Sequence, residues 1–174
     1  CGAIASQTSV FDAGQVIPVK PISEFNTQWE KAKRTFQDLS SPPIISIVGG
    51  GPAGIELAMS IKHRLSIDKV ENKFPHTAVS IKILTSGPEI LSSYPRNAQK
   101  RCRKILASAG IEVLTNWRVT EVKNKQLEND TGGKITVDEI IWATGSEAPE
   151  WLKTSGLPTS ERGFIQINHQ LRVI

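Results

Sequence analysis

Residues 44–57 read Ile44-Ile-Ser-Ile-Val-Gly-Gly-Gly-Pro-Ala-Gly-Ile-Glu-Leu57, and they carry the strongest indication of the fold. The apolar run from Ile44 to Val48 is typical of a strand that is buried on both faces of a parallel sheet. The glycines turn the chain, and the apolar residues between Ile55 and Leu65 predict a helix. A strand, a glycine-rich turn and a helix in this order predict an α/β domain with a parallel sheet.

The same alternation continues on both sides of this unit. Upstream, apolar residues recur at spacings of three and four and predict a helix that starts near Pro21 and Ser23: Phe25, Trp29, Ala32, Phe36 and Leu39. Before it, Val16–Val19 contains Pro18 and predicts an edge strand. Downstream we expect a loop over 66–77, a helix over 96–109 and further strands of the main sheet at 79–84, 111–114 and 140–145. We also expect antiparallel strands at 117–123 and 134–137, joined by turn residues 128–133, and a short strand at 164–167.

Composition excludes several classes of protein. Hydrophobic residues make up 39% and charged residues 22% of the 174 residues, which is ordinary for a folded globular domain. No run approaches the roughly 18 apolar residues that cross a bilayer. The two cysteines, Cys1 and Cys102, have no metal-ligand spacing and form no redox pair. The sequence has no zinc or helix-turn-helix signature, and its basic residues are not interleaved with aromatic ones, so nothing indicates binding of nucleic acid.

The net charge of the chain is +4, and basic residues cluster between Arg96 and Lys104. The first interpretation is a solvated helix face. The second is a surface that attracts anions, such as a nucleotide phosphate or an anionic membrane.

The glycine motif Gly49-x-Gly51-x-x-Gly54 carries the chemistry, because it follows a strand and opens a helix. Gly49 permits the tight turn, Gly51 lets a pyrophosphate approach the backbone, and Gly54 lets the helix pack closely on the sheet. N–H groups near Gly51, Pro52, Ala53 and Gly54 meet the positive end of the helix dipole, which attracts anions. Pro52 suits the first turn because its missing N–H would be unpaired there. The motif predicts a Rossmann-type dinucleotide site.

Two positions near this motif leave alternatives open. Glu56 either complements the helix dipole or helps to position the nicotinamide ribose. The end of the second strand, where an acid would bond the adenosine ribose, holds Thr85 and Ser86, with Glu89 slightly beyond. Thr85 comes 31 residues after Gly54, later than the usual spacing of roughly 20. The hydroxyl groups suit a ribose or a 2′-phosphate, so NADH and NADPH both remain.

Several segments together resemble the pyridine nucleotide-disulfide oxidoreductase family, in particular its type II NADH dehydrogenase-like branch. They are Val48–Leu57, Gly110–Val113, Arg118–Val122 and Trp142–Gly145. Val19–Glu24 also resembles the lead into the NAD domain of flavoproteins fused to, or related to, selenide water dikinase. Members of the family contain one Rossmann domain for FAD and a second one for NAD(P)H. The resemblance carries the glycine loop, including Gly50, onto this chain. It places Val119 beside adenine and Ala143, Thr144 and Gly145 on the nicotinamide side.

The resemblance also implies how the chain is organised. We expect a lead-in segment and helix at 1–43, an NAD(P)-binding Rossmann domain at 44–148, and a return segment at 149–174 toward a missing FAD domain. The expected fold is α/β, with a Rossmann-type parallel sheet, helices on both faces and a small antiparallel β-meander. No second glycine fingerprint occurs before residue 44, and no redox cysteine pair is present.

Three functions follow as hypotheses. The first is the NAD(P)H-binding domain of a flavin-dependent oxidoreductase, which positions nicotinamide for hydride transfer to the FAD of the full-length parent. The fragment alone would then be inactive. The second is the FAD-binding domain of such an enzyme, and the third is a non-catalytic scaffold built on a nucleotide site. The parent is expected in the cytoplasm or at the membrane periphery. The expected partners of this domain are a nicotinamide nucleotide and the FAD domain of the same parent chain, while peripheral membrane contact of the parent and a homodimer remain open.

Overall fold

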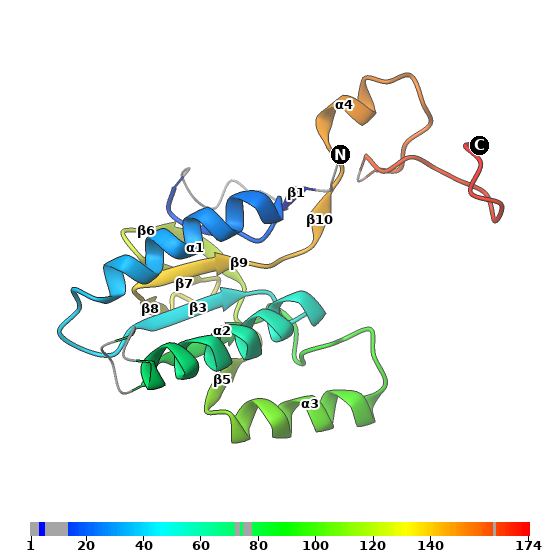
Figure 1. The fold of residues 1–174 in the computed structure, drawn as a ribbon. Coiled ribbons are helices and arrows are strands. Elements are labelled where there is room, and N and C mark those ends of the chain that lie inside the picture. Colours follow the sequence, from blue (N-terminus) through cyan, green and yellow to red (C-terminus); the bar gives the residue numbers. More distant parts are fainter. Residues whose placement is uncertain (1–3, 6–13, 72–73, 75–77, 162) are drawn as a thin grey trace.

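The chain forms a five-stranded parallel sheet in the order β2-β9-β3-β4-β5 (Figure 1). The computed structural model describes residues 4–5, 14–71, 74, 78–161 and 163–174. The strands of the sheet are β2 (Ile17–Pro18), β9 (Glu139–Trp142), β3 (Ile44–Val48), β4 (Ser80–Leu84) and β5 (Ile111–Leu114). The longer helices are α1 (Ile22–Phe36), α2 (Pro52–Val70) and α3 (Arg96–Ser108).

Two smaller sheets complete the fold. The antiparallel meander consists of β6 (Val119–Lys123), β7 (Gln126–Asn129) and β8 (Lys134–Thr136). A short pair joins β1 (Ile4–Ala5) to β10 (Ser146–Glu147), and the short helix α4 (Glu150–Lys153) follows it. Among the helices in the described ranges, none is long and apolar enough to cross a membrane.

The order of the strands creates a reversal between β3 and β9. The chain runs from β3 through α2 to β4 and through α3 to β5, always stepping to the same side of the sheet. It then returns and adds β9 on the other side of β3. Ligands of open α/β sheets bind beyond the carboxyl ends of the strands at such a reversal. The turn that carries the glycines begins at this point.

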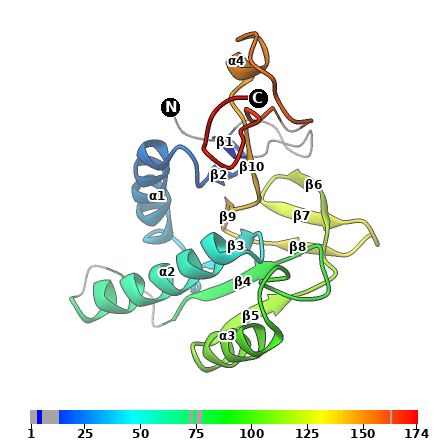
Figure 2. The ribbon, with the colours of Figure 1, turned by 90° about the vertical axis from the view of Figure 1, so that its right-hand side faces the viewer.

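Each face of the sheet has its own apolar core, because successive strand residues point to opposite faces. On one face, the alternate residues Ile45, Ile47, Ile81 and Ile83 share a buried cluster with residues of α1, α2 and α3. On the other face, Leu84, Ile140 and Trp142 pack with Val122 and Leu127 of the meander. Figure 2 shows α1 and α2 on one side of the sheet and β6–β8 on the other.

The α/β class, the parallel sheet and the meander are therefore confirmed, and one detail is corrected. Helices on both faces were expected, whereas the meander covers the second face in their place. The physical reason lies in the connection from β5 to β9. Its buried residues Val122, Leu127 and Val137 are spaced for short strands, and they close the core from that side.

Helix α2 is longer than the apolar pattern indicates. It extends from Pro52 to Val70, so the first residues of the predicted loop over 66–77 are helical. Residues 72, 73 and 75–77 of that loop lie outside the described residues. The apolar pattern does not predict the last turn, because the buried residue there is the polar Asp68. Its carboxylate lies 2.9 Å from the Arg64 Nε and 3.8 Å from the Lys33 Nζ of α1.

Strand β7 was not predicted as a strand. Its only fully buried apolar residue is Leu127, so the segment lacks an alternating pattern. The turn before it places Asn124 and Lys125 at φ 51° and 60°, which is the geometry of a tight hairpin. At 164–167 the expected strand is wrong, since only isolated bridges join Thr159 to Ile165 and Ile167 to Val173.

Candidate functional site

The glycine turn after β3 gives each glycine a different task. Gly49 has φ +131°, and a Cβ there would lie 2.5 Å from the carbonyl oxygen of Ala143. At Gly54 a Cβ would lie 2.0 Å from the carbonyl oxygen of Gly49, so this glycine permits close packing of α2 on the turn. A Cβ at Gly51 would meet nothing within 4 Å. The structure therefore requires glycine at 49 and 54 for packing, while at 51 it leaves open space.

The start of α2 presents backbone donors toward this open space. Gly51 is the N-cap, no side chain caps the helix, and Pro52 is its first residue. The first four N–H groups of a helix have no partner within the helix, and the helix dipole makes this end positive. An anion above Gly51 would thus meet both the N–H groups and the dipole.

A cavity of about 490 Å³ lies along the carboxyl edge of the sheet and includes the glycine turn. It extends from the ends of β2 and β9 across β3 to the end of β4 and the loop after β5. All predicted site residues except Gly54 and Glu56 line it: Gly49, Gly50, Gly51, Pro52, Ala53, Thr85, Ser86, Val119, Ala143, Thr144 and Gly145. The structure thus brings together residues from four separate parts of the chain.

The two remaining predicted residues lie elsewhere. Gly54 is buried beneath the turn, where it has the packing role described above. Glu56 is exposed and does not line the cavity. Because α2 begins at Pro52, Glu56 lies in the second turn, and the first turn contains no acidic residue.

Further lining residues were not singled out from the sequence. Val19 and Lys20 follow β2, Val48 and Leu84 end their strands, Trp142 ends β9, and Trp117 and Arg118 follow β5. All of them come at or just after the carboxyl end of a parallel strand. The predicted order of strands was therefore the signal that could have identified them.

One polar atom in the cavity wall has no partner. The Oγ1 atom of Thr144 is buried and makes no hydrogen bond to any described residue. Buried hydroxyl groups are nearly always hydrogen-bonded. Thr144 lines the cavity, so a polar ligand there would supply the missing partner.

The charges around the cavity favour an anion. Its lining includes two cationic side chains, Lys20 and Arg118, and no Asp or Glu of the described ranges. Together with the positive end of α2, this composition suits phosphate groups. The glycine cradle, the donors at the helix start and the unpartnered Thr144 hydroxyl fit a dinucleotide.

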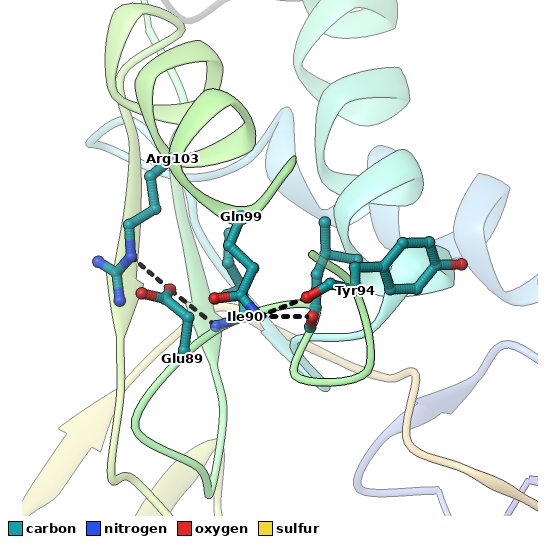
Figure 3. Close-up of polar contacts among 6 residues, drawn as sticks. Glu89, Ile90, Tyr94, Gln99 and Arg103 are labelled. Atoms are coloured by element: carbon teal, nitrogen blue, oxygen red, sulfur yellow. Dashed lines mark hydrogen bonds and ion pairs between the residues drawn. The ribbon is translucent and has the colours of Figure 1, made fainter. Parts of the chain in front are cut away.

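The loop between β4 and α3 supports the glycine turn from outside. The Leu91 N–H donates to the carbonyl oxygen of Gly50 at 2.8 Å. The Gln99 amide of α3 donates to the carbonyl oxygens of Leu91 and Tyr94 at 3.1 and 2.9 Å, as Figure 3 shows. Through this loop, α3 helps to hold the Gly50 peptide in place.

Glu89 belongs to the same loop but contacts α3 rather than the cavity. The Arg103 Nε donates to its carboxylate at 2.5 Å, and the Ile90 N–H donates to the same oxygen at 2.9 Å (Figure 3). The hydrogen bond from Arg103 lowers the pKa of Glu89 below its usual range. Glu89 is thus engaged with α3 and does not line the cavity.

Comparison with known proteins places this architecture in a family. The family described as pyridine nucleotide-disulphide oxidoreductase matches residues 12–174. A dihydrolipoyl dehydrogenase from Thermus scotoductus is 28% identical over 167 residues, covering 89% of this chain and 33% of that protein. The external NADH-ubiquinone oxidoreductase 2 from Saccharomyces cerevisiae mitochondria is 24% identical, covering 99% of this chain and 36% of that protein.

A solved structure has the same fold. It is that of NDH2 from Plasmodium falciparum in complex with NADH, which superposes with a TM-score of 0.78 at 19% identity. The match covers 99% of this chain and 39% of that one. The chain spans about a third of the length of the relatives it matches. With the family match over nearly all of its length, the chain belongs to the pyridine nucleotide-disulphide oxidoreductase family and is distantly homologous to type II NADH dehydrogenases.

Proposed function

We propose that this chain is the NAD(P)H-binding domain of a flavin-dependent oxidoreductase of the NADH dehydrogenase type. The observation that carries the proposal is the open space above Gly51, between the donors of α2 and the strand ends. A pyrophosphate placed there would meet backbone N–H groups and no side chain.

The strand order supports a placement of the two ends of the dinucleotide. Thr85, Ser86 and Val119 lie at the β4–β5 side of the turn, where the adenosine would bind. Ala143, Thr144 and Gly145 follow β9 on the opposite side, where the nicotinamide would bind. The unpartnered Thr144 hydroxyl would donate to or accept from the nicotinamide half.

The residues of this chain would bind and orient the nucleotide. The nicotinamide supplies a hydride, for which we propose an FAD of the parent protein as the acceptor. The chain's contribution is to fix the ring against the end of β9 and to hold the pyrophosphate on the backbone of the glycine turn. No side chain of the cavity needs to transfer a proton in this scheme.

The FAD-binding alternative is less well supported by the end of β4. The family resemblance implies an acid there in FAD sites as well, and this chain has Thr85 and Ser86 in that place. The only acid of the following loop, Glu89, is bonded to Arg103. We therefore expect FAD to bind more weakly than a nicotinamide nucleotide.

Calorimetric titration of the purified chain with NADH, NADPH and FAD tests the proposal. We expect saturable binding of a nicotinamide nucleotide, and we expect it to be lost in Gly51→Val. Binding of FAD alone would favour the FAD-domain alternative, and binding of none of the three would favour the scaffold hypothesis. Either result would overturn the proposed function.

A further inference from the structure

The adenosine end of the cavity is built from hydroxyl groups and a guanidinium group. Thr85 and Ser86 follow β4, and Arg118 follows β5; these three residues are called the β4–β5 rim below. Among the residues that the structure describes, none with a carboxylate lines the cavity at this end or elsewhere. The rim therefore offers hydroxyl groups and a positive charge at the place where an acid commonly binds the ribose diol of NADH.

Backbone hydrogen bonds fix Arg118 beside the end of β4. The Thr85 N–H donates to the carbonyl oxygen of Leu114, and the Trp117 N–H donates to that of Thr85, both at 2.9 Å. The Asn116 N–H donates to the carbonyl oxygen of Gly87, also at 2.9 Å. The segment leading to Arg118 is thus fastened along the segment that contains Thr85 and Ser86.

Arg118 is also available to a ligand. Its side chain is exposed and forms no ion pair with any residue in the described ranges. Its own carbonyl oxygen accepts from the Asp130 N–H at 3.1 Å, which ties the backbone to the meander. A guanidinium on a fixed backbone can bind a phosphate through two parallel hydrogen bonds.

The acid in the loop after β4, Glu89, does not replace the missing carboxylate. Glu89 is bonded to both Arg103 and the Ile90 N–H, and α3 holds its loop through Gln99 (Figure 3). Moving Glu89 into the cavity would break both of its hydrogen bonds. The rim therefore lacks the group that commonly binds the 2′-hydroxyl of NADH.

We propose that the β4–β5 rim binds the 2′-phosphate of NADPH, so that this site selects NADPH over NADH. The inference rests on the proposed function and assigns its nucleotide. A 2′-phosphate carries negative charge, which a carboxylate would repel and which Arg118 attracts. The hydroxyl groups of Thr85 and Ser86 supply further donors to the phosphate oxygens.

Arg118→Gln tests the rim directly. The substitution removes the charge but keeps a polar side chain at an exposed position. We expect the affinity for NADPH to fall roughly tenfold or more, while that for NADH stays within about twofold. The matched control is Arg101→Gln, which removes the same charge from an exposed position on α3 outside the cavity and should change neither affinity.

A second measurement needs no variant. The adenosine half of NADPH is 2′,5′-ADP and that of NADH is 5′-AMP, so calorimetry with these two probes isolates the phosphate. We expect 2′,5′-ADP to bind more tightly, with an advantage that shrinks as salt is raised. Equal binding of NADH and NADPH, unaffected by Arg118→Gln, would overturn this inference and leave the proposed function standing. Failure to bind either nicotinamide nucleotide would overturn the proposed function itself.

Discussion

The glycine turn and the β4–β5 rim belong to one cavity, but they are built in different ways. The turn offers backbone: donors at the start of α2 and an open approach above Gly51. The rim offers side chains: Thr85, Ser86 and Arg118 on backbone that is fastened by hydrogen bonds. We therefore expect the turn to bind the pyrophosphate of any dinucleotide and the rim to determine which dinucleotide binds.

The largest effect should come from the packing glycine of the turn. In Gly54→Ala the new methyl group would lie 2.0 Å from the carbonyl oxygen of Gly49, and neither backbone segment can yield. We expect the free energy of unfolding to fall by roughly 3 kcal/mol, measured by urea denaturation. Gly51→Ala adds the same methyl group where nothing lies within 4 Å and serves as the control. Equal stability losses in the two variants would contradict the packing role of Gly54.

Gly51→Val should separate binding from folding. Its φ of −81° suits any residue, and its side chain would project into open space. We expect the free energy of unfolding to change by no more than about 1 kcal/mol. The affinity for NAD(P)H should fall by at least roughly tenfold, because the valine would occupy the path of the pyrophosphate. A folded variant with undiminished affinity would show that the pyrophosphate does not lie over this turn.

Thr85→Glu should alter the choice of nucleotide through the rim. A carboxylate at this place would accept from a ribose hydroxyl and repel a 2′-phosphate. We expect the ratio of NADH to NADPH affinity to rise by at least about fivefold, measured by parallel titrations. Thr85→Gln is the matched control without the charge. An unchanged ratio would mean that Thr85 does not face the ribose.

The smallest effect concerns the loop that supports Gly50. The pKa of Glu89 is lowered in the folded chain, chiefly by the hydrogen bond from Arg103. Glu89 therefore stabilises the fold above its ordinary pKa of 4.5, and this contribution is lost as the pH falls through the lowered value. Between pH 5 and pH 3, wild type should lose more stability than Glu89→Gln in thermal unfolding. The difference should be small because the pair is partly exposed to solvent. A parallel loss in both proteins would contradict the lowered pKa.

The same contrast explains what the sequence could and could not predict. The parallel strands and the glycine turn leave strong local signals, and most of the residues proposed for the site line one cavity. Arg118, Lys20 and Trp117 follow predicted strands, but it is the order of the strands in the sheet and the loop pairing that bring them into one cavity, and a local pattern does not encode those. Asp68 and Leu127 show why boundaries were missed, since a buried ion pair and a single buried leucine leave no periodicity.

Amide chemical-shift mapping by NMR shows whether the nucleotide binds over the glycine turn. The 15N-labelled chain would be titrated with NADPH and, separately, with NADH. We predict that the largest shifts occur at the amides of Gly50, Gly51, Ala53 and Gly54, with Thr144 also shifted, and that those of Ser86 and Arg118 move more with NADPH. Shifts confined to the basic face of α3, at Lys100, Arg101 and Lys104, with the glycine turn unchanged, would contradict the account.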